Sequence, residues 1–483
     1  MSVAAEDVPR DDLHGPGKLP LRLKSETADS TAGVNTPLSS NPLAIPDTQT
    51  VLLLHATRQP YVLQDGYPVP ALQHDREVLV RNRAIGLNPM DWKAPDFNFG
   101  IPVLPYISGR ELAGEVVDPG QSSRFQSGDK VIVISTDYRD LRKAAYQQYA
   151  ISLDYNTVRL PPHLSFEEGA TLGVAFVVAA LSIGVNMGLD FSHVHDGPDL
   201  YTLLRSLPPE SIPADVREEC LGNLEEGDRA RPGDWVAVWG ASSTSANLIL
   251  QLARLAGLRT IAIADTAKHG LRLSHHQSLK PDLLVDSHDP ARAVDIIRAT
   301  VRRHPTQGAS KGANGNGSGN GGLRFGIDTR GRESAAWLMR ALDVTGPDNQ
   351  DEEEADHDGD DTTEEDNVPP VEVNQPPSPP STPDRNRNDK PALPTAFPTS
   401  TTTQPQKSHL IALTGLPKPP FPPPYQNHNI PNFHTIPIKL FHDLPPLGEA
   451  LVLWLERLLA HGLIAPADII DIQQGGLGSV NGL

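Results

Sequence analysis

Residues 236–250, VAVWGASSTSANLIL, join a turn to a run of hydroxyl side chains in a way that suits phosphate binding. The apolar run ends at Gly240, and a helical pattern follows four hydroxyl residues: Ser242, Ser243, Thr244 and Ser245. Free N–H groups in the first turn of a helix, together with the helix dipole, attract negative charge. Gly240 permits a tight turn, and Ala246 is small enough to keep the helix close to its strand. The stretch therefore predicts a phosphate-binding loop, although Ser and Thr before a helix are also ordinary N-caps.

The elements around this turn form a repeating strand–helix pattern. DWVAVWG predicts a strand, SANLILQLARLAG has the apolar spacing of a helix that ends at Gly257, and RTIAIAD predicts a second strand. Such βαβ units build a parallel sheet whose ligands bind at its carboxyl edge. The pattern continues through predicted strands at 282–286, 324–328 and 408–415 and predicted helices at Pro290–Arg302 and Arg332–Leu342.

The preceding part of the chain is rich in short strands. Val51–Leu54, Glu77–Ile85, Gly114–Val117 and the end of residues 127–133 have β-type composition between Pro and Gly turns. A helix is predicted at Phe166–Gly188. Its uncharged run Gly169–Leu189 is long enough to span a membrane, but the internal Gly, Ser and Asn residues favour a helix buried inside the protein.

Several segments are too polar to bury a core. We expect a disordered tail at 1–45 and disordered insertions at 305–322 and 345–407, which are rich in Gly, Asn, Ser, Pro and acidic residues. Twelve carboxylates between Asp348 and Asp366 account for much of the formal charge of −19, so the rest of the chain carries −7. A mildly acidic folded part without a basic cluster argues against a nucleic-acid partner.

The single cysteine, Cys220, excludes a disulfide framework and a four-cysteine metal site. The chain opens without a charged and then apolar secretory signal. We therefore expect a cytoplasmic protein without a membrane partner.

Five segments occur in an order typical of one superfamily: RNRAIGLNPMDWK, ISGRELAGEVV, FQSGDKVIV, PGDWVAVWGASSTSANLILQLARLAG and HGLIAPADIIDIQQGGLGSVNGL. The chain thus resembles the zinc-free branch of the medium-chain dehydrogenase/reductase superfamily, which includes quinone oxidoreductases and fungal trans-acting enoyl reductases. In these enoyl reductases Ser, Thr and Ala often replace the glycines of the phosphate loop.

The resemblance implies an α/β fold in which a doubly wound Rossmann sheet is inserted in a discontinuous GroES-like, β-rich catalytic domain. The catalytic domain would comprise residues 46–190 and 430–483, and the Rossmann domain residues 191–429. Relatives continue beyond the segment that matches the end of this sequence. We therefore expect the second part of the catalytic domain to be incomplete.

Zinc-dependent relatives carry a Cys in the segment that matches Asn88–Asp91 and a His–Glu pair that matches Arg110–Glu111. This chain has Asn-Pro-Met-Asp and Arg-Glu at these places. A guanidinium group does not ligate zinc, so we expect no metal. Without a metal to polarise a carbonyl group, hydride transfer to an activated C=C bond or to a quinone is favoured over alcohol oxidation.

The resemblance also assigns roles to side chains. Residues beside the nicotinamide would be Asn88, Asp91, Trp92 and Lys93, and the substrate pocket would include Gly173, Val174, Ala175 and Phe176. Lys93 is a candidate for stabilising an enolate oxygen, and its alternative is a surface lysine. Tyr106 is a candidate proton donor, although the sequence favours a packed loop aromatic, with protonation by solvent instead.

Cofactor choice depends on the end of the second Rossmann strand. Asp265 is placed to accept hydrogen bonds from a ribose 2′-hydroxyl, whereas Lys268 beyond it would pair with a 2′-phosphate. We expect NADPH, with NADH as the alternative. The substrate would be a small molecule, with a carrier-bound thioester as one form of it, and both a monomer and a homodimer are compatible with the sequence.

Two functions remain open from the sequence. The first is a zinc-independent reductase of enoyl thioesters, enones or quinones that takes part in secondary metabolism. The second is a catalytically impaired NAD(P)-binding scaffold of the same fold, with its acidic insertion as an interaction tail.

Overall fold

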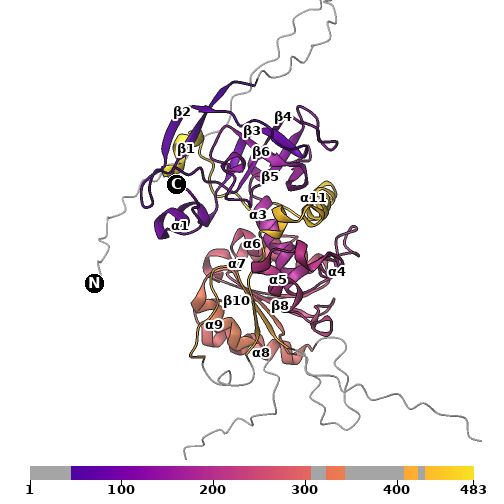
Figure 1. Ribbon diagram of the computed structural model, residues 1–483. Coiled ribbons are helices and arrows are strands. Elements are labelled where there is room, and N and C mark those ends of the chain that lie inside the picture. Colours follow the sequence, from indigo (N-terminus) through magenta and orange to yellow (C-terminus); the bar gives the residue numbers. More distant parts are fainter. Residues whose placement is uncertain (1–44, 306–321, 343–406, 422–429, 483) are drawn as a thin grey trace, which may run out of the picture. The chain divides into compact units, whose positions relative to one another are not determined.

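Figure 1 presents a computed structural model of the chain, which describes residues 45–305, 322–342, 407–421 and 430–482. The predicted disordered tail and insertions lie outside these described residues, apart from their end positions. Within the described ranges the chain forms a parallel sheet, an antiparallel sheet with a separate two-stranded ribbon, and the helices that cover them.

The parallel sheet has the strand order β10-β9-β8-β11-β12-β13, and every neighbouring pair runs in the same direction. Its strands are β8 (Trp235–Trp239), β9 (Arg259–Ala264), β10 (Leu283–Asp286), β11 (Phe325–Asp328), β12 (His409–Ala412) and β13 (Asn432–His434). Five of them occupy positions that the apolar pattern predicts. The continuous apolar runs arise because this sheet is buried on both faces.

Alternate residues of β8 show the two buried faces. Val236 and Val238 belong to one apolar cluster, whereas Ala237 and Trp239 belong to a second one. Helix α6 (Thr244–Leu255) packs on the first face, and α8 (Pro290–Arg303) and α9 (Arg332–Ala341) pack on the second. This is the doubly wound arrangement that the sequence predicts. Helix α7 (Thr266–His275) connects β9 to β10.

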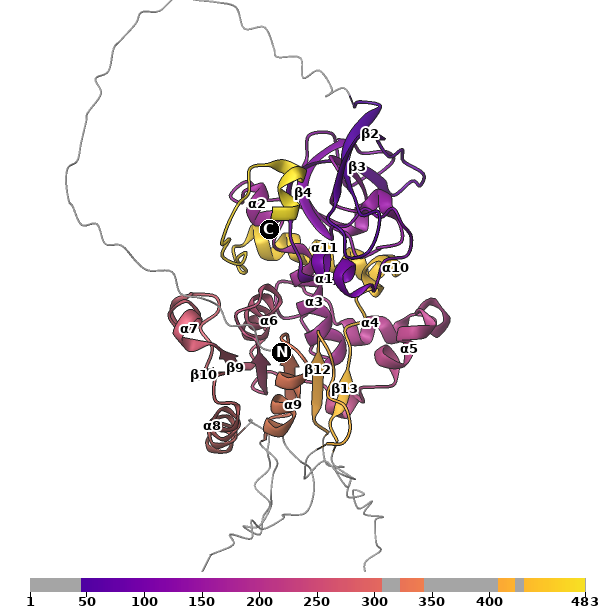
Figure 2. The same cartoon turned by 90° about the vertical axis from the view of Figure 1, so that its left-hand side faces the viewer.

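The chain leaves the sheet centre in one direction through β8, β9 and β10, and then returns to β11 on the other side of β8. Figure 2 shows β9 and β10 on one side of this point and β12 and β13 on the other. Loops that leave β8 and β11 therefore diverge at the carboxyl edge, and sheets of this class bind their ligands where such loops diverge.

The antiparallel sheet has the order β6-β3-β4-β5-β7. Its strands are β3 (Glu77–Gly86), β4 (Glu111–Asp118), β5 (Lys130–Ile134), β6 (Tyr149–Leu153) and β7 (Thr157–Arg159). The strands β1 (Thr48–Leu53) and β2 (Val62–Pro68) form a separate antiparallel ribbon. Apolar residues of β1, β3, β4 and β5 share one core cluster, so this part of the chain has its own interior.

The long apolar segment forms α2 (Phe166–Gly169), α3 (Gly173–Leu181) and a π-helical turn at Ser182–Asn186. By length and composition this stretch is able to cross a membrane, yet 78% of its most apolar window is buried inside the protein. Helix α3 packs against α6, and its apolar residues join the core on that face of the parallel sheet. The prediction of a helix buried inside the protein is therefore confirmed for this segment.

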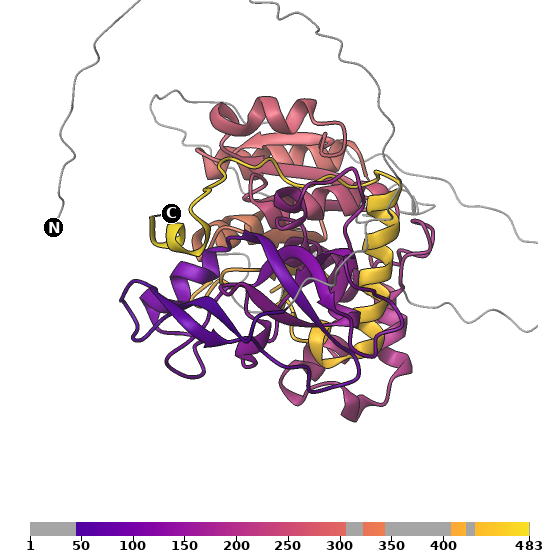
Figure 3. The same cartoon turned by 90° about the horizontal axis from the view of Figure 1, so that it is seen from above.

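The segment Phe191–Arg231, whose structure the sequence does not predict, contains α4 (Leu200–Ser206) and α5 (Ala214–Leu221). After the parallel sheet the chain forms α10 (Leu440–Asp443) and α11 (Pro445–Ala460), the long yellow helix in Figure 3. Helix α11 packs against α3 and β7, so the chain returns to the part that contains the antiparallel sheet. The predicted fold class, a Rossmann sheet inserted in a discontinuous β-rich domain, is confirmed.

Two details concern the segments at and after the predicted boundary at residue 430. The predicted boundary at residue 430 assigns Asn432–His434 to the catalytic domain, but these residues pair with β12 as the edge strand β13 of the parallel sheet. Three residues are too short for a strand pattern to be recognised. At the other end, residues Gly476–Gly482 form a 3-10 helix that packs against β1, and Asn481 exchanges two hydrogen bonds with the backbone of Tyr61.

Candidate functional site

The turn after β8 has the geometry of a close backbone approach. Gly240 has φ +82°, a value that L side chains rarely adopt, and a Cβ atom there would lie 2.5 Å from Thr329 Oγ1. The N–H groups of Gly240 and Ala241 both donate to Ile263 O, which fixes the turn against β9. Only glycine fits this position without displacing the loop that follows β11.

The hydroxyl residues of the turn have different surroundings. Ser243 is the N-cap of α6: its hydroxyl oxygen accepts a hydrogen bond from Ala246 N (3.2 Å), and the hydroxyl donates to Thr329 Oγ1 (2.9 Å). Thr244 is exposed, and Ser242 and Ser245 are half-buried. The N–H groups of Thr244 and Ser245 lie in the first turn of α6, where a helix has no internal acceptor for them. Ala246 is fully buried, as the predicted close contact between helix and sheet requires.

A pocket of about 600 Å³ lies at this carboxyl edge. Each of four strands and the loop or helix after it contributes to the lining: β8 gives Trp239, β9 gives Asp265 and Lys268, β10 gives Ser287, His288 and Pro290, and β11 gives Arg330, Gly331, Arg332, Glu333, Ser334 and Trp337. The cationic side chains of Lys268, Arg330 and Arg332 outnumber the two carboxylates of Asp265 and Glu333. The pocket is therefore suited to an anionic ligand.

The carboxyl group of Asp328 anchors the loop that carries Arg330. Asp328, the last residue of β11, is fully buried, and its Oδ1 accepts hydrogen bonds from Arg330 N (3.1 Å) and Gly331 N (2.8 Å). Burial raises the pKa of Asp328. Arg330, His288 and Ser287 were not predicted as site residues. Their position directly after the carboxyl ends of β11 and β10 is the signal that would have identified them.

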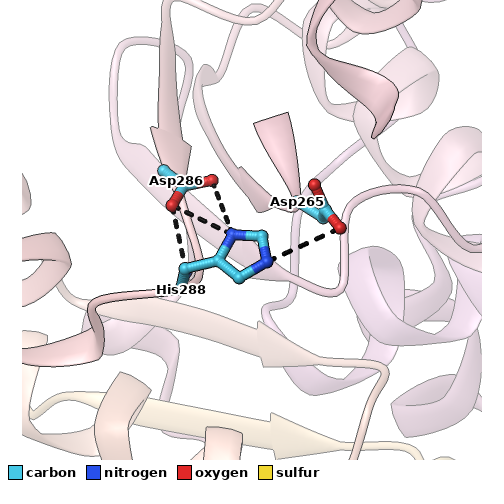
Figure 4. Close-up of side chains that lie close together, drawn as sticks. All are labelled: Asp265, Asp286 and His288. Carbon is cyan, nitrogen blue, oxygen red and sulfur yellow. Dashed lines mark hydrogen bonds and ion pairs between the residues drawn. The ribbon is translucent and has the colours of Figure 1, made fainter. Parts of the chain in front are cut away.

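Asp265, Asp286 and His288 lie close together, as Figure 4 shows. Asp265 and His288 also line the pocket. His288 Nε2 is 3.7 Å from Asp265 Oδ2, and His288 Nδ1 is 3.2 Å from Asp286 Oδ2. Asp265 also caps α7 by accepting from Lys268 N (3.0 Å), and Asp286 accepts from Thr266 N (3.0 Å). These backbone hydrogen bonds are the main reason why the pKa values of both carboxyl groups are lowered. The cluster is accounted for by helix capping.

A second group of polar residues surrounds Glu111 at the start of β4. Glu111 Oε1 accepts from Asn88 Nδ2 (2.9 Å), and Oε2 accepts from Val174 N (2.8 Å). Burial raises the pKa of Glu111 to about 7. The side chain thus joins the N-cap of α1 (Pro89–Phe97) to the first turn of α3. Asn88, a predicted cofactor residue, and Val174, a predicted substrate residue, are thus both bonded to Glu111. Glu111 received no role in the sequence analysis.

Asp91 differs from its predicted position beside the nicotinamide. Its side chain is only 5% exposed, and Oδ2 accepts from Asn88 N (2.8 Å) in the capping box of α1. Burial raises its pKa. Asp91 therefore positions the helix and is not open to a ligand in this structure. Trp92 is 53% exposed, and Lys93 Nζ lies 5.4 Å from the centre of the Trp92 ring.

Tyr106, the predicted proton donor, is buried in the structure. The side chain is 2% exposed, and its hydroxyl oxygen accepts from Arg110 Nη2 at 2.9 Å. Its backbone pairs with Leu54, and burial raises its pKa. This environment fits the alternative of a packed loop aromatic, and the role of Tyr106 as proton donor remains an untested prediction.

The predicted substrate segment is mostly interior. Gly173, Ala175 and Phe176 are buried, and the Phe176 ring lies 5.5 Å from that of Trp454 in the core. Only Val174 is partly exposed. The aromatic side chain of Phe176 packs against Trp454 of the neighbouring helix α11, and its role as a lining residue remains an untested prediction.

The residues that match the zinc ligands of other family members do not suit that metal. Arg110 donates to Tyr106 and lies 5.4 Å from the centre of the Tyr138 ring, and Glu111 is occupied by Asn88 and Val174. Zinc sites in proteins use thiolate, imidazole and carboxylate ligands, and this position offers only the last. The absence of a catalytic metal remains a prediction.

The fold and the turn after β8 define a two-domain protein in which a dinucleotide-type sheet interrupts a β-rich domain. A sequence profile of the alcohol dehydrogenase GroES-like domain matches residues 74–162, which contain the antiparallel sheet. The trans-enoyl reductase caaB of Aspergillus niger is 30% identical over 256 residues, which are 52% of this chain. The match covers 60% of the length of that relative.

Solved structures extend the likeness to most of the chain. The enoyl reductase CurK has a TM-score of 0.52 with 15% identity and covers 90% of this chain and 95% of its own. The quinone oxidoreductase of Escherichia coli, solved with NADPH, has a TM-score of 0.50 with 14% identity and covers 90% of this chain and 96% of its own. Because the sequence identities are only 14–15%, these two structures show a shared fold and nothing more. The chain is therefore similar in sequence to trans-enoyl reductases and has the fold of enoyl reductases and quinone oxidoreductases of known structure.

Proposed function

We propose that the protein is a zinc-independent reductase that transfers hydride from a nicotinamide dinucleotide to an activated C=C bond, as in an enoyl thioester or enone, or to a quinone. The observation that carries this proposal is the pocket at the carboxyl edge of the parallel sheet, next to the Gly240 turn. The trans-enoyl reductase relatives support the reaction class. The non-catalytic scaffold has no observation in its favour.

The turn supplies what a diphosphate requires. Main-chain N–H groups at the start of α6 have no internal acceptors, and the hydroxyl groups of Ser242, Thr244 and Ser245 stand beside them. Ser243 is already paired with Thr329 and Ala246 N, so we assign it to holding the turn. Arg272 Nη2 donates to Ser242 O (3.3 Å), which places a guanidinium group next to this anion site.

We propose NADPH as the preferred cofactor. The carboxylate of Asp265 caps α7, and its Oδ2 lies 3.6 Å from Lys268 Nζ, so its negative charge is partly compensated. Lys268 and Arg330 both line the pocket and match the charge of a 2′-phosphate. NADH, which lacks this phosphate, would lose these contacts.

The bound nicotinamide would supply the hydride, and the chain would orient the acceptor and stabilise its charge. Lys93 is the cation that we assign to the developing enolate oxygen, because its half-buried side chain has no ion pair within the described ranges. The buried Tyr106 is unsuited to proton transfer, so we assign protonation of the α-carbon to solvent. Substrates would be small molecules, including carrier-bound thioesters, reduced in the cytoplasm by a monomer or a homodimer.

The test has two stages. NADPH and NADH are titrated against the full chain by nicotinamide fluorescence, and cofactor oxidation is then followed with crotonyl thioester and with a quinone. We expect tighter binding of NADPH and oxidation by at least one acceptor class. Binding without oxidation by either acceptor would contradict the proposed activity, and failure to bind either nucleotide would contradict the proposed site.

A further inference from the structure

Helix α1 has an unusual distribution of side chains. Its buried residues are Asp91, Ala94 and Pro95, whereas Met90 and Phe97 on the opposite side are 41% and 66% exposed. A surface helix normally buries its apolar stripe and exposes its polar residues. Here the large apolar side chains are exposed, so packing among the described residues does not account for their placement.

The exposed apolar residues continue beyond the helix. We call this set the α1 apolar surface: Leu87, Met90, Trp92, Phe97, Phe99, Val103 and Leu104, which are 41–66% exposed. They fall within 18 consecutive residues, whereas Leu271 and Ile296 are isolated in the sequence and, among the described residues, two further groups are only pairs, Val62 with Leu63 and Ile470 with Ile472. Single exposed apolar residues are normal, but a contiguous group marks a binding surface.

The backbone under this surface is held in place. Phe99 N donates to Ala94 O (3.2 Å), and Arg58 N and Nε donate to Pro95 O and Asp96 O (both 3.2 Å). The rings of Trp92 and Phe97 contact each other with centroids 6.4 Å apart. The surface is thus built on an ordered helix end, which is a suitable platform for a specific ligand.

The surface is carried by the helix that also contains Lys93, the cation assigned to the enolate oxygen. Asn88, the N-cap of α1, is bonded to Glu111, and Glu111 in turn holds the start of α3. Lys93 lies over the Trp92 ring, so one cation stands within the apolar group. A ligand that fits this arrangement has an apolar chain and one polar end at which negative charge develops.

We propose that the α1 apolar surface binds the acyl chain of the substrate, so that the enzyme selects enoyl thioesters with long chains over short ones. This inference rests on the proposed function and specifies its substrate class. Each methylene group that binding removes from water increases the binding constant by about fourfold. Even partial cover of a long chain therefore gives a measurable preference.

The first measurement is binding without turnover. Decanoyl and butyryl thioesters of N-acetylcysteamine are titrated calorimetrically against the full chain, with and without NADP⁺. We expect the decanoyl compound to bind at least tenfold more tightly. Equal affinities would overturn the proposal whether or not the protein reduces any substrate, so this outcome differs from a failure of the proposed function.

The second measurement locates the preference. The double variant Phe97→Gln/Phe99→Gln changes only residues of the surface that have no assigned role in cofactor binding, and Leu271→Gln, at 77% exposure on α7, is the matched control. We expect the double variant to lose most of the chain-length preference while it retains NADPH affinity and crotonyl turnover. An unchanged preference, or an equal loss in Leu271→Gln, would overturn the proposal.

Light scattering examines whether the surface instead joins two copies of the chain. The proposal would also be overturned if the wild type were a dimer, the double variant were a monomer, and both had the same chain-length preference. Thermal unfolding of both variants verifies that they fold.

Discussion

The carboxyl edge of the parallel sheet and the region around α1 contribute to one proposed site but are built differently. The first consists of regular strands, a positive-φ glycine and helix N-termini, so backbone groups provide most of the proposed ligand contacts. The second depends on individual buried side chains, above all Glu111 and Asp91. Binding by backbone groups follows from topology and tolerates changes of side chain, whereas the α1 region depends on particular contacts.

The largest effect is expected at Gly240. Gly240→Val combines positive φ with a Cβ contact of 2.5 Å to Thr329 Oγ1, so the turn must move. NADPH affinity should fall by roughly a hundredfold, because several backbone hydrogen bonds to the diphosphate are lost together. Gly233→Val is the control: its φ is +94° but no atom lies within 4 Å of the added Cβ, so it has the strain without the collision. Equal affinity losses in both variants would contradict this account.

Lys93 tests the α1 region directly. Lys93→Gln should lower kcat by roughly tenfold to a hundredfold with unchanged NADPH affinity, since the cation acts on charge that develops during the reaction. Lys130→Gln is a matched control, because Lys130 also lies over an aromatic ring, that of Phe166 at 5.3 Å. A kcat for Lys93→Gln equal to that of the control would leave Lys93 as a surface residue.

The cationic side chains of the pocket decide cofactor preference. Lys268→Gln/Arg330→Gln should weaken NADPH binding by roughly tenfold or more and change NADH binding little, because only NADPH carries a 2′-phosphate. The comparison is made by fluorescence titration with both nucleotides, and Lys280→Gln removes an exposed charge outside the pocket as a control. A parallel loss for both nucleotides would place the phosphate elsewhere.

Glu111 gives a pH-dependent effect on stability. Its pKa is raised from 4.5 to about 7 in the folded state, so folding favours the protonated form. Stability from this group is complete below pH 4.5 and is lost as the pH rises to about 7, by about 3 kcal/mol in total. Glu111→Gln does not titrate, so its unfolding free energy relative to the wild type should increase over this range. A difference that is constant between pH 4.5 and 7.5 would show that Glu111 is ionised in the folded state.

The smallest effect is expected for Tyr106→Phe. Its hydroxyl group only accepts from Arg110, so the change should cost about 1 kcal/mol of stability and leave kcat within about twofold. Steady-state kinetics and denaturant unfolding measure the two quantities. A large loss of kcat with normal stability would restore the phenol as proton donor.

The difference between the two regions also explains what the sequence predicts. The strands of the parallel sheet, α6 and the Gly240 turn follow from apolar runs, helical spacing and one glycine, because burial on both faces leaves a clear pattern. The short edge strand β13 lacks such a pattern, and α4 and α5 lie in a segment of mixed polarity.

In the site, the sequence predicts residues next to Gly240 and at the end of β9, because these positions follow from the strand–helix order. It places Asp91, Tyr106 and Phe176 in functional roles, whereas the structure buries all three side chains. Residue type alone does not reveal whether a side chain faces a ligand or the core. Glu111 and Arg330 escape notice because their importance comes from contacts between segments far apart in the sequence.

The central claim is that a dinucleotide binds along the turn after β8 and in the pocket beside it. The most direct measurement is a crystal structure of the full chain with NADPH. We predict the diphosphate against the N–H groups of Ser242, Thr244 and Ser245 and the 2′-phosphate between Lys268 and Arg330. A nucleotide bound elsewhere, or an empty turn in crystals saturated with NADPH, would contradict the account.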